Sequence, residues 1–121
     1  LGDIYGPADF RKKLIPYLLE NENNNQIDFN SDGYGAFSPI YIDDVIKSIY
    51  QITKSNNKKF SIEYLYSEVM YLKEFLKNYK LIRNKNFQSV FNSKNKSISF
   101  LSPRKNLPTF ETSLEIGLLS L

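Results

Sequence analysis

The chain has 121 residues and a formal net charge of +3, and 41% of its residues are hydrophobic, which is enough for one small core. It contains no cysteine and no histidine, which excludes thiolate nucleophiles, disulfides, imidazole bases and the usual zinc ligands. Because no apolar stretch is long enough to span a bilayer and no cysteine is present, we expect a cytoplasmic protein without a metal site.

The first predicted elements follow a Gly-Pro turn at positions 6–7. Apolar side chains at helical spacing predict a helix within Phe10–Glu20. Because proline is tolerated only in the first turn of a helix, Pro16 moves the expected start close to Ile15. A short half-buried strand is predicted at Gln26–Asn30, where apolar and polar residues alternate.

The next segment, Phe37–Ile42, is rich in residues that favour strands, but Pro39 limits it to an edge strand or an irregular segment. Asp43 and Asp44 then open an amphipathic helix. Two carboxylates at a helix start could form a general acid–base pair or a Mg²⁺ site. We favour capping, because such residues accept hydrogen bonds from free N–H groups and meet the positive end of the helix dipole.

The second half of the chain is expected to contain a strand, a helix and short extended pieces, at Phe60–Tyr66, Tyr71–Tyr79 and Leu81–Leu101. Thr112 and Glu115 have the spacing of a capping box, which predicts a short helix over Ser113–Leu118. No internal repeat or linker divides the chain. The pattern therefore predicts one α/β unit.

Three short phrases carry a resemblance to a known family: DIYGP at residues 3–7, KLIP at 13–16 and YIDDV at 41–45. Their order and distances, with the closing stretch LPTFETSLEIGL, resemble the extended short-chain dehydrogenase/reductase family, in particular its nucleotide-sugar epimerases, dehydratases and reductases. The resemblance implies an α/β fold with short strands and about four helices, the C-terminal nucleotide-sugar-binding portion of such an enzyme.

In that family a Rossmann half precedes these phrases and carries the glycine-rich dinucleotide-binding loop and the catalytic residues. The resemblance therefore implies that residues 1–121 are a single fragment with no catalytic residue of its own, and that the fragment alone binds no dinucleotide. The parent enzyme would use NAD or NADP to modify a nucleoside-diphosphate sugar for surface polysaccharide biosynthesis. Tyr50 and Lys54 also spell Tyr-x-x-x-Lys, but we interpret that match as a coincidence on a structural helix.

The resemblance implies six substrate-binding positions, which are Asp3, Lys13, Leu14, Phe29, Phe37 and Arg104. Asp3 replaces the family's Asn near the sugar and phosphate, and Lys13 and Leu14 match the start of the helix that covers the diphosphate and base. Phe29 matches the strand beside the base, and Phe37 stands where many members have an arginine. Arg104 would replace an arginine that lies near the C-terminus in other members of the family and contacts the diphosphate. Core packing for the apolar positions and a solvated charge for the cationic ones remain the alternatives.

The partners expected from this resemblance are a nucleoside-diphosphate sugar, the missing Rossmann half and further copies of the chain. Without that half, five apolar side chains would lose their cover and favour a homo-oligomer, namely Ile4, Tyr5, Phe37, Ile40 and Tyr41. We expect no nucleic acid and no membrane as partner. The alternative is a stand-alone basic α/β module that binds a phosphate-bearing partner through lysine and aromatic side chains.

Overall fold

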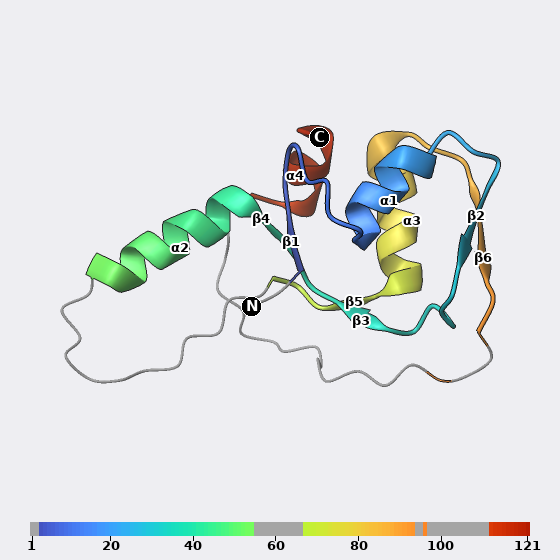
Figure 1. Ribbon diagram of the computed structural model, residues 1–121, viewed down its shortest axis with the longest axis horizontal. Coiled ribbons are helices and arrows are strands. Elements are labelled where there is room, and N and C mark those ends of the chain that lie inside the picture. Colours follow the sequence, from blue (N-terminus) through green and yellow to red (C-terminus); the bar gives the residue numbers. More distant parts are fainter. Residues whose placement is uncertain (1–2, 55–66, 94–95, 97–111) are drawn as a thin grey trace.

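The computed structural model describes residues 3–54, 67–93, 96 and 112–121. Within them, short strands and four helices form the expected α/β fold (Figure 1). In chain order the elements are β1 (Asp3–Tyr5), α1 (Leu14–Asn21), β2 (Gln26–Phe29), β3 (Ala36–Phe37), β4 (Pro39–Tyr41), α2 (Ile42–Lys54), β5 (Met70–Tyr71), α3 (Leu72–Arg83), β6 (Gln88–Phe91) and α4 (Leu114–Leu119). No helix in these ranges has the length and apolar character needed to cross a bilayer. The strand predicted at residues 60–66 lies outside the described residues.

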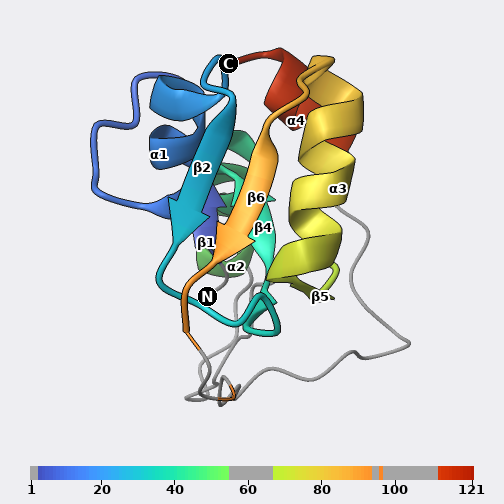
Figure 2. The same cartoon turned by 90° about the vertical axis from the view of Figure 1, so that its right-hand side faces the viewer.

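The described strands associate as three pairs. β1 and β4 are parallel, with Ile4 opposite Ile40, and β2 and β6 are parallel, with Ile27 opposite Ser89. β3 and β5 are antiparallel. Figures 1 and 2 both show α1 and α3 on the same side of the β2–β6 pair. That arrangement covers one face of the pair, and none of the helices in the described ranges lies on its other face.

The core lies between that pair and the two helices. Ile27 and Phe29 are buried while Gln26 and Asp28 are exposed, so the predicted alternation in β2 is confirmed. Leu18 of α1 and Phe75 and Tyr79 of α3 are fully buried against them. Each such side chain contributes ~1.5–3 kcal/mol relative to exposure, so this contact holds the helices on the sheet pair.

Two helix ends differ from the sequence prediction. α3 continues to Arg83, four residues past the predicted end, and takes residues 81–83 from the region expected to be extended. It ends where Asn84 adopts a left-handed conformation with φ 52°, which asparagine tolerates better than most residues. At α4 the N-cap is Ser113, whose Oγ accepts a hydrogen bond from the Ile116 N–H at 3.2 Å. The capping box expected from Thr112 was therefore wrong by one residue.

The paired carboxylates lie in the first turn of α2, where the helix dipole favours negative charge. Asp44 is buried, and its Oδ2 accepts a hydrogen bond from the Thr112 N–H at 3.2 Å. The bond therefore reaches another segment of the chain. Asp44 joins the start of α2 to the residues that lead into α4.

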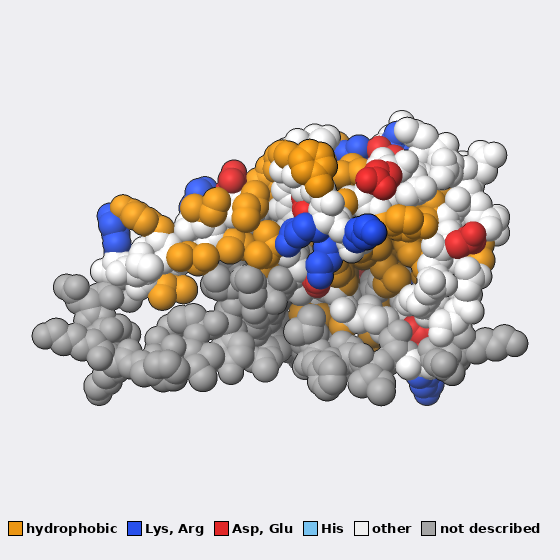
Figure 3. Space-filling model, viewed as in Figure 1, with side chains coloured by type: hydrophobic (Ala, Val, Ile, Leu, Met, Phe, Trp, Pro, Cys, Tyr) orange, Lys and Arg blue, Asp and Glu red, His pale blue; other side chains and the backbone are white. Residues whose placement is uncertain are grey.

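The expectation of five uncovered apolar side chains around β1 and β4 was wrong for Tyr5 and Ile40, which are only 2% and 1% exposed because they pack inside this chain. The other three, Ile4, Phe37 and Tyr41, are half-buried. Exposed apolar side chains lie on several other elements, and three of them gather on α2, where Ile46, Ile49 and Tyr50 are each more than half exposed. Figure 3 shows apolar side chains along this helix. We call these three residues the α2 apolar face.

Candidate functional site

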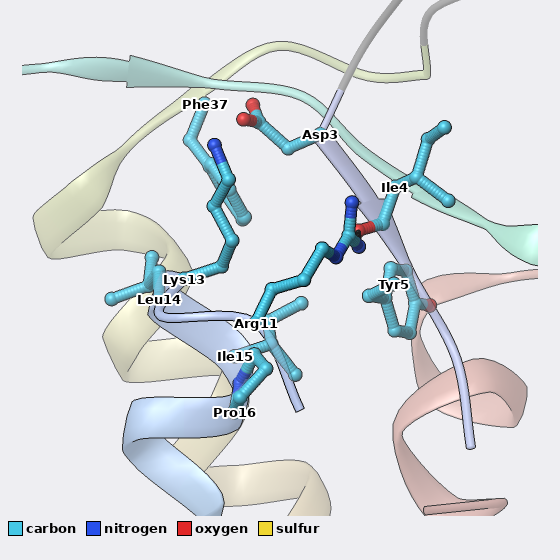
Figure 4. Close-up of a pocket in the computed structure, with 9 residues that line it drawn as sticks. All are labelled: Asp3, Ile4, Tyr5, Arg11, Lys13, Leu14, Ile15, Pro16 and Phe37. Atoms are coloured by element: carbon cyan, nitrogen blue, oxygen red, sulfur yellow. Dashed lines mark hydrogen bonds between the residues drawn. The ribbon is translucent and has the colours of Figure 1, made fainter. Parts of the chain in front are cut away.

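A cleft of about 360 Å³ lies between β1, the end of β3 and the segment that leads into α1 (Figure 4). Four of the six residues predicted to bind substrate line it, namely Asp3, Lys13, Leu14 and Phe37. They come from three separate stretches of sequence. The fold therefore brings these positions together, whatever ligand they serve.

Asp3 is held at the rim of the cleft by the strand pairing. Its backbone N–H donates to the Ser38 carbonyl at 2.7 Å, and its Oδ2 accepts from the Ser38 N–H at 3.2 Å. Ser38 is itself fully buried between β3 and β4. The carboxylate is thus anchored through one oxygen to a rigid backbone position. In Figure 4 the side chains of Lys13 and Arg11 extend toward it.

Arg11 also lines the cleft, and the sequence analysis did not single it out. Its Nε and Nη2 donate to the two oxygens of Asp9, each at 2.7 Å, and Nη2 also donates to the Ile4 carbonyl at 2.8 Å. Hydrogen bonding from Arg11 holds the pKa of Asp9 below its usual range. The guanidinium is therefore fixed in orientation although the side chain is half exposed. The run Arg-Lys-Lys directly after the turn was the available signal.

Lys13 precedes α1 as its N-cap residue in an extended conformation and makes no side-chain cap hydrogen bond. The first N–H groups of a helix have no acceptor within it, and Leu14 and Ile15, which carry two of them, line the cleft. The following residue, Pro16, has no N–H group that needs an acceptor. The positive end of the α1 dipole and the side chains of Arg11 and Lys13 therefore all lie at the cleft.

The two aromatic residues predicted to bind substrate, Phe37 and Phe29, lie in different places. Phe37 forms a wall of the cleft, and its ring packs edge-on against Phe75 with centroids 4.7 Å apart. Phe29 is not among the residues that line the cleft. It is buried in the core and stacks on Phe91 at 5.6 Å, an arrangement that fits the core-packing alternative. Arg104 lies outside the described residues.

The sequence raised two other possibilities, a Tyr-x-x-x-Lys pair and a metal site on paired carboxylates. Tyr50 and Lys54 share an exposed face of α2, with the Lys54 Nζ 4.4 Å from the ring centroid, and neither lines the cleft. In the described ranges no cluster of three or more acidic side chains could hold a metal ion. The cleft is therefore the site at which the sequence-predicted residues meet.

No protein-family model matches the chain, and a search of curated proteins found no match. The family resemblance accordingly rests on the three phrases and the closing stretch of the sequence. What the fold and cleft define by themselves is coarser: a small α/β chain with a cleft at the start of a helix, lined by Arg11, Lys13 and the carboxylate of Asp3.

Proposed function

We propose that this chain is the substrate-orienting portion of an NAD(P)-dependent enzyme that modifies a nucleoside-diphosphate sugar, acting in surface polysaccharide biosynthesis in the cytoplasm. One observation carries the proposal: Arg11, Lys13 and the first N–H groups of α1 converge on the cleft whose rim holds Asp3.

A diphosphate is the ligand group that best matches these donors. Helix N-termini bind phosphate oxygens through free N–H groups and the positive end of the dipole. Arg11 adds a planar guanidinium and Lys13 an ammonium group. Phe37 stands where the resemblance would place an arginine, and Arg11 offers a substitute for that charge. The Asp3 carboxylate would accept hydrogen bonds from sugar hydroxyl groups.

No dinucleotide site is proposed for this chain, because its sequence lacks a glycine-rich loop at which a helix could approach a pyrophosphate. We therefore assign no step of hydride or proton transfer to this chain. Its proposed contribution is to hold the sugar nucleotide in one orientation, which sets specificity.

Calorimetry of the 121-residue chain with UDP-glucose and dTDP-glucose tests the proposal. Saturable binding is expected, and Arg11→Ala or Lys13→Ala should weaken it by about tenfold at low salt, less at high salt, because each removes a charge-assisted contact. Asp3→Ala should weaken sugar-nucleotide binding more than binding of the free nucleoside diphosphate.

Lys12→Ala is the matched control, because it removes the same charge from an exposed neighbour that does not line the cleft. It should leave affinity nearly unchanged. Equal losses in Lys12→Ala and Lys13→Ala would mean that only net charge matters. The absence of saturable binding to both sugar nucleotides would also refute the assignment.

A further inference from the structure

A second concave site lies on α3, between that helix and β6, which run side by side in Figure 2. This groove has a volume of about 500 Å³ and shares no lining residue with the cleft. The titratable side chains along its described lining are all lysines. Lys73, Lys77 and Lys80 follow one another at the spacing that keeps them on one face of α3, and Lys85 comes just after its end.

Ser89 marks the floor of the groove. It pairs with Ile27 in the parallel register of β2 and β6, so its side chain points to the same face as the buried Ile27, toward α3. Its Oγ is buried from solvent and has no hydrogen-bond partner among the described residues. Buried hydroxyl groups almost always have a partner. Ser89 lines the groove and is only half-buried as a residue, so a change of its χ1 rotamer would present this hydroxyl to a ligand there.

The lysines around this hydroxyl are partly positioned already. The Lys73 Nζ lies 4.3 Å from the Tyr34 ring centroid and 5.1 Å from that of Phe91. The Lys80 Nζ donates to the Phe87 carbonyl at 3.0 Å. An ammonium group has three N–H donors, so Lys80 keeps capacity for a further acceptor. Lys77, exposed between these two, adds a charge that is not paired within the described part of the chain.

The nearby acidic group does not cancel this charge. Glu22 lies 3.5 Å from the Lys85 Nζ, but Arg83 donates to both of its oxygens at 2.7 Å and neutralises it. The titratable groups that line the groove therefore keep an excess of positive charge. A ligand group with several oxygens and more than one negative charge would satisfy Lys77, Lys80 and the hydroxyl together, which a single carboxylate does less well.

We propose that the groove between α3 and β6 binds the phosphate group of a small phosphorylated molecule, with Lys77 and Lys80 as cationic contacts and the Ser89 hydroxyl as the hydrogen-bonding contact at its floor. The site is separate from the cleft and does not depend on the function proposed for it. A nucleic acid is a poorer match, because Phe91, the aromatic residue in the described lining of the groove, has Phe29 stacked on one side and Lys73 over its ring.

The test uses the 121-residue chain and two probes, inorganic phosphate and glucose 6-phosphate, with glucose as the uncharged control. Backbone NMR shifts should change saturably along α3 and β6 with both phosphates and not with glucose. The Lys77→Ala, Lys80→Ala double variant should weaken binding by about tenfold or more. Lys54→Ala, which removes one positive charge from α2, should not weaken it.

Ser89→Ala separates a binding role from a folding role. Because the hydroxyl has no partner within the described residues, its removal should leave the melting temperature unchanged or higher while it weakens phosphate binding. Shifts confined to the cleft, or an equal loss in Lys54→Ala, would overturn the proposal. So would a single-stranded RNA that binds more tightly than either phosphate and is unaffected by Ser89→Ala.

Discussion

Gly117 shows how one missing side chain decides the packing of a helix. It lies in α4 against Tyr5, and a Cβ added there would overlap the Tyr5 hydroxyl. Tyr5 is buried, and its ring also meets Tyr41 edge-on at 5.5 Å. Burial, with Tyr41 and Asp44 nearby, raises the pKa of the Tyr5 phenol well above its usual value. The hydroxyl is therefore neutral and has little room to move.

We expect Gly117→Ala to lower the free energy of unfolding by ~1–3 kcal/mol, because the methyl group forces Tyr5 or α4 out of position. In an exposed helix the same change would stabilise by ~1 kcal/mol, so the sign of the effect is informative. Urea unfolding measures it. Adding Tyr5→Phe, which removes the overlapped oxygen, should recover part of the loss. A stabilised Gly117→Ala variant would contradict this packing.

At the scale of elements, a buried ion pair joins three helices. Glu22, the residue after α1, accepts hydrogen bonds from the Tyr79 hydroxyl at 2.5 Å and from Arg83 at 2.7 Å, both on α3. Arg83 also donates to the Leu118 carbonyl of α4 at 2.9 Å. Removing one partner would leave the other charge buried and unpaired, which is the costly way to break such a pair.

This pair predicts a dependence of stability on acid. Hydrogen bonding from Arg83, which outweighs the opposing effect of burial, lowers the pKa of Glu22 from 4.5 to about 2. A carboxyl whose pKa is lower in the folded state contributes stability that is present above pH 4.5 and is lost as the pH falls toward 2. The free energy of unfolding, measured with denaturant, should therefore fall between about pH 5 and about pH 2.

Glu22→Gln should reduce the acid-induced loss of unfolding free energy by ~1–3 kcal/mol, because the glutamine amide does not titrate. It should also lower stability at neutral pH. Glu20→Gln is the control, since Glu20 is an exposed carboxylate two residues earlier, on α1. Equal pH profiles for the wild type and Glu22→Gln would show that the ion pair does not control the acid response.

The elements that could be predicted from sequence are those with a strong local pattern. The helical spacing of apolar residues in α1 and the alternation of apolar and polar residues in β2 depend only on neighbouring residues. Both elements were therefore predicted nearly at their observed bounds. The end of α3 and the cap of α4 depend on tertiary contacts and on a one-residue choice between adjacent hydroxyl side chains. Arg11 was missed for a related reason: its position follows from bonds to Asp9 and Ile4 that no spacing rule encodes.

For the whole molecule, the α2 apolar face is the surface at which we expect copies of the chain to associate. Ile46, Ile49 and Tyr50 lie on one side of a helix, and each is more than half exposed. Burying side chains of this size is worth ~1.5–3 kcal/mol each, so the expected homo-oligomer stays a prediction with its contact moved to this helix. Sedimentation velocity at micromolar concentration should show species larger than a monomer.

The Ile46→Ser, Ile49→Ser double variant should sediment as a monomer, because it replaces two of the three apolar side chains with polar ones. Gln51→Ser changes an exposed residue of the same helix and should leave the sedimentation profile as it is. A wild-type chain that remains monomeric across the concentration range would contradict the prediction.

The two parallel strand pairs have a consequence for the order in which the chain folds. Ile4 pairs with Ile40 and Ile27 with Ser89, so neither pair can close as a hairpin. Loop closure must come before either strand gains its hydrogen bonds, which slows folding relative to a bundle of local contacts. On the ribosome, β2 leaves the exit tunnel well before β6 is made. Its edge and its apolar side chains stay open to other chains until then.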